Sequence, residues 1–120
     1  MSTPKDLALS VAAKYFSLWN DMKEEEAVNA CYTENAVLLA PGAPPAIGRK
    51  EILAYQQKTS SGTEVKEEDC EIVDAFESGS HVVARYAGKG TDKDGKTVTF
   101  KGILVCTKSP PQIFWECFNE

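Results

Sequence analysis

The sequence has little positive charge and no long apolar run. The first property argues against a nucleic-acid-binding protein and the second against a membrane-spanning one. Its 120 residues include 13 lysines and arginines against 18 acidic residues, for a net charge of -5. The basic residues are scattered, and Lys89, Lys93 and Lys96 surround a turn instead of forming a patch. Because phosphate binding needs clustered basic side chains, nucleic acid is not expected as the main partner. No apolar run approaches the roughly 20 residues that span a bilayer, so no membrane partner is predicted.

Histidine is nearly absent, and the cysteines are widely spaced. The single histidine, His81, opens a predicted strand after a turn, where a surface position is expected, and no nucleophile has an evident histidine partner. Cys31, Cys70, Cys106 and Cys117 form no CxxC pair. Their apolar surroundings favour reduced core thiols over a zinc site. Cys106 and Cys117 could still oppose each other across a hairpin. We expect no metal and no cofactor.

The start of the chain and the composition indicate a soluble globular protein. Residues 1–6, MSTPKD, have no apolar core behind a basic region, so a secretory leader is not predicted. Cytoplasmic residence is the expectation, although import by an internal signal stays open. With 42% hydrophobic and 26% charged residues, the chain has the composition and length of one domain over residues 1–120.

The beginning of the sequence predicts a long amphipathic helix. Thr3 is placed to cap it, Pro4 suits its first position, and Asp6 favours its positive end. Apolar residues then recur at three- and four-residue spacing, which predicts one core-facing stripe. The Tyr15 hydroxyl on this stripe needs a hydrogen-bond partner. The stripe consists of Leu7, Val11, Tyr15, Leu18 and Met22, widened by Phe16 and Trp19.

Two shorter helices and a short strand are predicted next. Asp21 with Glu24 resembles a second capping box, before a helix whose acidic first turn is read as solvated. A strand is predicted over 37–40, and the three prolines of 41–45 exclude regular structure there. A third helix follows Gly48 and ends near residue 60.

From residue 64 onward the pattern predicts β-strands. Turn sequences such as Ser78-Gly79-Ser80 separate four β-rich stretches, which indicates hairpins. The predicted strands cover 64–77, 81–91, 96–107 and 112–119. Helices followed by consecutive antiparallel strands give an α+β fold with the helices packed on one face of the sheet.

Glu116 is the most informative polar residue. By the two-residue period of a strand it shares a face with Phe114 and Phe118. A carboxylate between aromatic residues lies at a pocket mouth or is paired, because burial of a lone charge is costly. The opposite face, Ile113, Trp115 and Cys117, is also apolar. Such a strand must be covered on both sides, which suggests a pocket on one face and a partner subunit on the other. A rim glutamate paired with a basic residue is the alternative.

Arg85 interrupts an apolar strand, Val82-Val83-Ala84-Arg85-Tyr86. Alternation places it opposite Val82, Ala84 and Tyr86. It could complement Glu116 or an acidic ligand. We favour the other interpretation, in which it lies on the outer sheet face and covers apolar surface with its stem.

Four local sequences are informative together with the order of the elements: the aromatic residues of the first predicted helix with Trp19, Tyr32-Thr33-Glu34-Asn35-Ala36-Val37, the Pro41-Gly42…Pro45…Gly48-Arg49 crossover, and Ile113-Phe114-Trp115-Glu116-Cys117-Phe118-Asn119. In these features the chain resembles the superfamily of nuclear transport factor 2, ketosteroid isomerase and the SnoaL-like polyketide cyclases, most closely its SnoaL-like domains. The resemblance covers nearly the whole chain. It implies a cone-like, curved, mixed or antiparallel sheet wrapped around the N-terminal helices, with a deep, mostly apolar pocket and a dimer formed through the outer sheet face.

The resemblance to ketosteroid isomerase can be checked residue by residue. Those enzymes use a carboxylate base with a tyrosine and a protonated acid as donors. Tyr15 matches the donor and Tyr32 a supporting tyrosine. The base would fall at Ala40, and the acid at Ile103 or Leu104. Since both carboxyl groups are missing, that mechanism is not predicted.

Three functions remain open. We favour a homodimeric domain whose pocket binds a small apolar or weakly polar molecule, with Tyr15, Tyr32 and Glu116 as polar contacts. The second is an isomerase, dehydratase or hydrolase that uses Glu116 as general acid or base, with Tyr15 as donor. The third is an assembly module, similar to the association domain of calmodulin-dependent kinase. The expected pocket residues are Tyr15, Trp19, Tyr32, Ala40, Tyr55, Phe114, Glu116 and Phe118, with Gln56 a further candidate on the third helix.

Overall fold

Three α-helices and a six-stranded mixed sheet make up residues 3–119, which the structure, a computed structural model, describes. The predicted domain range also includes residues 1–2 and 120, which lie outside the described residues. The predicted α+β class is confirmed. Along the chain the elements are α1 (Pro4–Asn20), α2 (Glu24–Cys31), β1 (Tyr32–Leu39), β2 (Ala46–Ile47), α3 (Arg49–Ser60), a 3-10 turn (Glu67–Asp69), β3 (Cys70–Ser78), β4 (His81–Thr91), β5 (Thr97–Thr107) and β6 (Ile113–Asn119).

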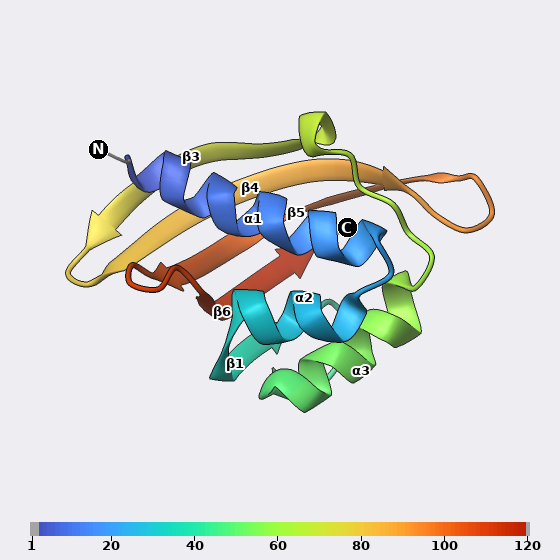
Figure 1. The fold of residues 1–120 in the computed structure, drawn as a ribbon, viewed down its shortest axis with the longest axis horizontal. Coiled ribbons are helices and arrows are strands. Elements are labelled where there is room, and N and C mark those ends of the chain that lie inside the picture. Colours follow the sequence, from blue (N-terminus) through green and yellow to red (C-terminus); the bar gives the residue numbers. More distant parts are fainter. Residues whose placement is uncertain (1–2, 120) are drawn as a thin grey trace.

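The sheet is open and has the strand order β2-β1-β6-β5-β4-β3. Neighbouring strands are antiparallel except β1 and β6, which run parallel. Figure 1 shows α1 lying across the sheet, with α2 and α3 beside β1. The helices therefore cover one face, as predicted. Within residues 3–119 no helix has both the length and the apolarity to cross a membrane.

Helix α1 begins as predicted and ends earlier. The Thr3 hydroxyl accepts a hydrogen bond from the Asp6 amide at 3.1 Å, and the Asp6 carboxylate accepts one from the Thr3 amide, which completes a capping box. Val11, Tyr15 and Trp19 are buried. Met22 was wrongly placed on the core stripe, since the helix ends at Asn20 and Met22 lies in the following turn, 88% exposed.

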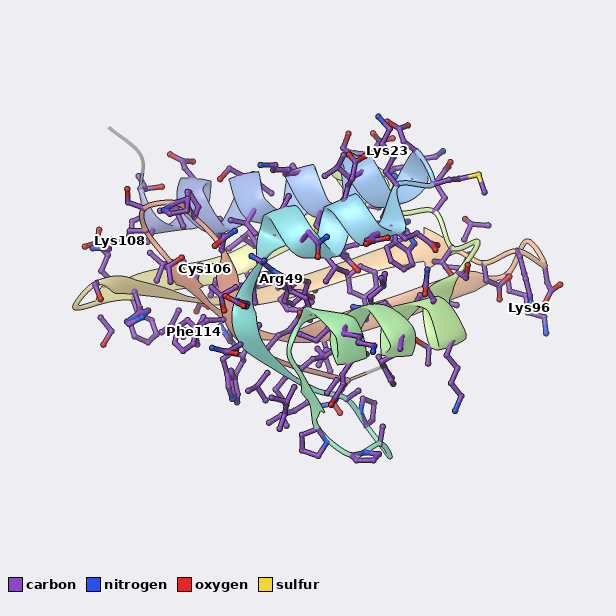
Figure 2. The ribbon with its side chains drawn as sticks, turned by 60° about the horizontal axis from the view of Figure 1, so that its bottom comes forward. Lys23, Arg49, Lys96, Cys106, Lys108 and Phe114 are labelled. Atoms are coloured by element: carbon purple, nitrogen blue, oxygen red, sulfur yellow. The ribbon has the colours of Figure 1, made fainter. Side chains whose placement is uncertain are left out.

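The second predicted capping box is also wrong. Lys23 occupies the N-cap position of α2, without a side-chain hydrogen bond, and the Asp21 amide instead donates to the Ser17 carbonyl at the end of α1. Strand β1 begins at Tyr32, five residues before the predicted start at residue 37. Figure 2 shows Arg49 near this start of β1, where its Nε donates to the Tyr32 carbonyl at 2.9 Å.

The stretch predicted as one strand over 64–77 contains less strand than expected. Only a single bridge, Glu64 to Thr91, precedes the 3-10 turn, and β3 begins at Cys70. Asn20 supplies the reason, because its side-chain amide accepts from the Val65 amide at 3.1 Å and donates to the Val65 carbonyl at 2.7 Å. Both backbone groups are thereby satisfied by a helix side chain instead of a neighbouring strand.

Candidate ligand-binding cavity

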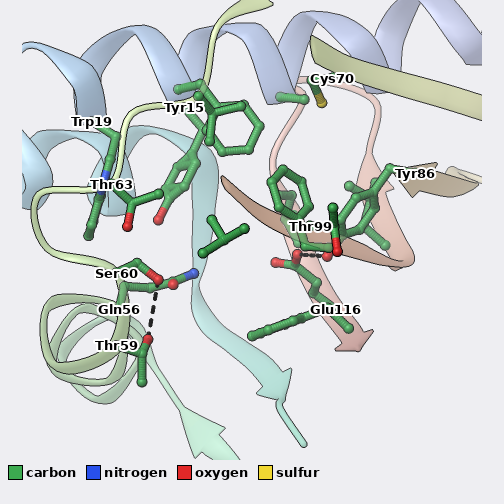
Figure 3. A pocket seen from close by; sticks show the side chains of 18 of the residues that line it. Tyr15, Trp19, Gln56, Thr59, Ser60, Thr63, Cys70, Tyr86, Thr99 and Glu116 are labelled. Atoms are coloured by element: carbon green, nitrogen blue, oxygen red, sulfur yellow. Dashed lines mark hydrogen bonds between the residues drawn. The ribbon is translucent and has the colours of Figure 1, made fainter. Parts of the chain in front are cut away.

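A cavity of about 220 Å³ lies between α1, the covered face of the sheet and the end of α3. Figure 3 shows polar side chains at two of its sides: Glu116, Tyr86 and Thr99 on the sheet, and Gln56, Thr59, Ser60 and Thr63 at α3 and the loop after it. The remaining wall is mostly apolar. The lining residues are Ala12, Tyr15, Phe16, Trp19, Tyr32, Gln56, Thr59, Ser60, Thr63, Val65, Cys70, Tyr86, Asp92, Val98, Thr99, Phe100, Leu104, Ile113, Glu116 and Phe118.

Glu116 is the buried acid of this cavity, 8% exposed. The Tyr32 hydroxyl donates to one of its oxygens at 2.5 Å, and the Tyr86 hydroxyl donates to the other. Burial raises the pKa of Glu116 above its ordinary value, and the two tyrosine hydrogen bonds act in the opposite direction. Three strands thus meet at one carboxyl group, since Tyr32 begins β1, Tyr86 lies on β4 and Glu116 on β6.

A glycine makes room for the Tyr86 hydroxyl. Tyr86 pairs with Gly102 across β4 and β5, and a Cβ atom at Gly102 would lie 2.8 Å from the Tyr86 hydroxyl oxygen and 2.4 Å from the Cys117 carbonyl oxygen. Any larger residue there would move the tyrosine. The sequence therefore keeps this strand position free of a side chain where the polar cluster forms.

The three tyrosines around Glu116 stay protonated. Burial first, and then the nearby Glu116 charge, raise the pKa of Tyr15, Tyr32 and Tyr86 above the ordinary value. The Tyr15 hydroxyl makes no hydrogen bond to a group of residues 3–119. Since every fully buried side-chain oxygen and nitrogen of these residues has a partner, this hydroxyl is not fully enclosed by protein. The Tyr15 hydroxyl is consequently open to the cavity, where a ligand could reach it.

Stacked and edge-on rings form much of the wall. The Tyr15 ring stacks on Trp19, with centroids 5.7 Å apart, and meets Tyr32 edge-on at 5.8 Å. On the sheet side Phe100 lies between Phe16 and Tyr86, at 5.9 and 6.2 Å. Such offset and edge contacts are favourable arrangements of aromatic rings and hold the wall in place.

Five of the eight residues expected in the pocket line this cavity: Tyr15, Trp19, Tyr32, Glu116 and Phe118. Three do not. Ala40 follows β1 and is half-buried; Tyr55 packs on Phe118 from α3, with ring centroids 6.3 Å apart; and Phe114 packs on His81 at 4.6 Å. Gln56, the further candidate on α3, does line the cavity.

A β-bulge explains the misplaced face of β6. Trp115 pairs with Val105, and Ile113 pairs with Cys106, so that Phe114 is an extra residue between two consecutive residues of β5. The strict alternation assumed from the sequence therefore fails before Glu116. Ile113 shares the cavity with Glu116, contrary to the prediction that it faces away, and Phe114 does not.

The structure also settles the roles left open for Arg85 and the cysteines. Arg85 forms an exposed bidentate pair with Asp74, at 2.8 and 2.7 Å, on the sheet face opposite Tyr86 and Glu116. The alternative that it complements Glu116 is wrong. Cys106 pairs with Ile113 and Cys117 with Ile103, so these two cysteines do not oppose each other. All four thiols are free, and residues 3–119 contain no group of three metal-ligating side chains.

Tyr86 is the important site residue that the sequence reasoning missed. Its alternation with Val82 and Ala84 already placed it on the buried side of β4, where a hydroxyl needs a partner. The need of the buried Tyr86 hydroxyl for a hydrogen-bond acceptor could have indicated its pairing with a buried acid. Thr63 and Thr99 gave no such signal, because exposed and cavity-lining threonines look alike in a sequence.

Comparison with known proteins identifies the family. The sequence model described as SnoaL-like domain matches residues 12–112. The chain belongs to the SnoaL-like domain family. This confirms the resemblance seen in the sequence. No curated protein matches the chain.

Solved structures share the fold of this SnoaL-like chain. An NTF2-like protein of unknown function from Shewanella oneidensis MR-1 aligns with a TM-score of 0.79 and 18% identity, over 98% of this chain and 100% of that one. A ketosteroid isomerase-like protein from Erwinia carotovora atroseptica aligns with a TM-score of 0.71 and 23% identity, over 96% and 95%. The orange carotenoid protein of Anabaena (Nostoc) sp. PCC 7120, solved with canthaxanthin, aligns with a TM-score of 0.73 and 15% identity, over 91% of this chain and 35% of that protein.

Proposed function

We propose that this SnoaL-like domain binds a small apolar or weakly polar molecule in the cavity between α1 and the sheet. The observation that carries the proposal is the Glu116 carboxyl group, which lines the cavity with both oxygens already held by Tyr32 and Tyr86. Each oxygen keeps a further acceptor site. The Tyr15 hydroxyl lines the same cavity. An apolar wall with a few convergent polar groups is typical of ligand sites.

The size of the cavity limits the ligand. A cavity of roughly 150 Å³ can hold benzene, and sites for drug-sized molecules begin near roughly 300 Å³. The value of about 220 Å³ lies between them. We therefore infer a ligand with about one ring or its equivalent in branched carbon, smaller than the four-ring steroids.

Thermal denaturation with a panel of one-ring alcohols, phenols and ketones tests this function. A ligand present at roughly 100 times its Kd should stabilise the fold by about 2.7 kcal/mol and raise Tm by several degrees. Ala12→Leu places three further carbon atoms in the lining and should remove the shift. Ala54→Leu makes the same change at an exposed position of α3 and should keep it.

Two results would overturn the proposal. One is that no compound of the panel raises Tm. The other is that Ala12→Leu responds to the active compounds as strongly as the unaltered protein does.

An acid–base enzyme is the second candidate, because one buried carboxyl group with a raised pKa shares the cavity with a free tyrosine hydroxyl. A general acid or base needs a pKa near the working pH. The ketosteroid isomerase arrangement does not support it, since Ala40 lies outside the lining and Leu104, which pairs with Glu116, is apolar. Mass spectrometry of the same panel after incubation tests this candidate: a product that Glu116→Gln no longer forms would favour it.

We further propose that the domain forms a homodimer through the sheet face that no helix of residues 3–119 covers. Strand register places an apolar row across five strands of this face, from Phe76 through Val83, Val105 and Trp115 to Val37. Phe76 is 60% exposed, and Ile103 on the next row is 41% exposed. A second copy of the chain would cover both. The assembly-module alternative uses the same face.

A further inference from the structure

The cavity contains acidic side chains and no basic one. Of its twenty lining residues, Glu116 and Asp92 are acidic, and none is lysine, arginine or histidine. Asp92 is engaged in its own hairpin, where one carboxylate oxygen accepts from the amides of Asp94 and Lys96, both at 2.9 Å. Lys96 itself lies at the tip of that hairpin (Figure 2) and is not among the lining residues. When Glu116 is ionised, no cationic side chain of the lining balances its charge.

The groups that do contact Glu116 leave part of it available. Two tyrosine hydroxyls donate to it, one to each oxygen. These are neutral donors, so they satisfy hydrogen bonding without neutralising the charge. An ionised carboxylate has about four acceptor sites, and Glu116 borders the cavity. A ligand that carries a positive charge would supply the missing counter-charge in surroundings where few water molecules compete.

The wall around this carboxyl group is unusually aromatic. Seven of the twenty lining residues have aromatic rings, although aromatic residues make up only 9% of the sequence. Six of these rings form one contiguous group, in which Tyr15 contacts Trp19, Tyr32 and Phe16, and Phe100 contacts Phe16 and Tyr86. Aromatic rings attract cations through their quadrupole, most strongly when the cation has lost its water. A neutral apolar ligand gains packing from these rings and a weaker interaction with their charge distribution than a cation does.

We propose that the ligand of this cavity is a small organic cation, of the alkyl-substituted ammonium class, held by the Glu116 carboxylate and the surrounding aromatic wall. This inference rests on the proposed ligand-binding function and narrows its ligand class. A quaternary ammonium group suits both features, since it is only weakly hydrated and its methyl groups pack against rings. Its volume also fits about 220 Å³ better than a fused-ring compound does.

The opposite side of the cavity suggests one further property of the ligand. Gln56, Thr59 and Ser60 present an amide and two hydroxyl groups there. A cation with a short hydroxyl-bearing arm could place its charge at Glu116 and its hydroxyl at this end. Choline has this shape, and 3,3-dimethylbutan-1-ol is its neutral counterpart with carbon in place of nitrogen.

Isothermal titration calorimetry with these two compounds and with tetramethylammonium tests the inference. The unaltered protein should bind choline about tenfold or more tightly than the neutral alcohol. Glu116→Gln should bind the two compounds about equally, or the neutral alcohol more tightly, because the amide offers no charge. Glu71→Gln removes the same charge from an exposed position of β3 and should leave the preference unchanged. Tetramethylammonium should follow choline, with a smaller advantage from the missing hydroxyl.

Each outcome is informative about a different claim. Equal or tighter binding of the neutral alcohol by the unaltered protein would overturn the cation inference and leave the ligand-binding function standing. Absence of binding by all three compounds, while the one-ring panel still raises Tm, would overturn it in the same way. If neither the three titrated compounds nor any compound of the one-ring panel binds, both the proposed function and this inference are wrong. The comparison between choline and its neutral counterpart needs no variant, so it stands even if Glu116→Gln does not fold.

Discussion

Glu116 shows how a buried acid makes the stability of this fold depend on pH. Burial raises its pKa in the folded protein, and Tyr32 and Tyr86 offset part of that effect. In the unfolded chain the Glu116 carboxyl group has its ordinary pKa. The folded state therefore holds the proton more tightly, which favours folding below the unfolded pKa. As the pH rises through the folded pKa, the group must ionise inside the protein and this contribution is lost.

We predict that the free energy of unfolding of the unaltered protein falls relative to that of Glu116→Gln as the pH rises above about 4.3, the ordinary pKa of a glutamate side chain. Each unit by which the folded pKa exceeds the unfolded one corresponds to about 1.4 kcal/mol of this difference. Urea denaturation followed by tryptophan fluorescence at several pH values measures it. The Glu71→Gln variant, changed at an exposed position, provides the control. Its free energy of unfolding should change with pH in the same way as that of the unaltered protein. A difference that grows in the opposite sense with pH would contradict the burial argument.

At the scale of elements, the segment between α3 and β3 depends on one side chain of α1. Asn20 satisfies both backbone groups of Val65, which is 4% exposed and lines the cavity. Asn20→Ala would leave a partly buried amide and carbonyl without partners, at a cost of about 1–3 kcal/mol. Because the contact is local, the loss should be concentrated in this segment.

Hydrogen exchange with mass spectrometry should therefore show faster exchange over residues 62–69 in Asn20→Ala. Thr3→Ala removes the cap at the other end of the same helix and should cost about 1 kcal/mol without a selective change in that segment. If the two variants gave the same exchange pattern over 62–69, the segment would owe its conformation to something other than Asn20.

The sequence predicted the elements whose signals are local. The capping residues of α1, the turn at Gly79, the antiparallel hairpins and the burial of Tyr15 all follow from nearby residues, and the structure confirms them. The features that the sequence could not predict depend on residues far apart in the chain. Asn20 replaces a strand at Val65, 45 positions away, and the bulge at Phe114 reverses a face of β6 through its register with β5. Because of that bulge Phe114 lies outside the cavity, and Tyr86, which lines it, was not among the expected pocket residues.

At the scale of the whole molecule, the two faces of the sheet are unequal. One packs on the helices and forms the core, and the other carries the apolar row from Phe76 to Val37 without a helix of residues 3–119 above it. Burying such a row removes apolar surface from water at about 25 cal/mol per Å². Specific, stable protein–protein interfaces commonly bury about 800 Å² on each partner, and those of obligate homodimers bury more. A sheet face of several strands can supply an area of that order.

We predict that the purified protein has twice the 13.1 kDa mass of one chain in solution, and that Phe76→Lys and Ile103→Arg shift it to the monomer. Each variant would bury an unpaired charge in the proposed interface, which is costly. Met22→Lys makes a similar change at an exposed apolar residue in the turn between α1 and α2, on the helix side, and should remain dimeric. Light scattering after size-exclusion chromatography measures all four masses. A monomeric unaltered protein, or a dimer that survives both sheet variants, would show that the outer face is not the interface, whereas dissociation by Met22→Lys alone would place the interface on the helices.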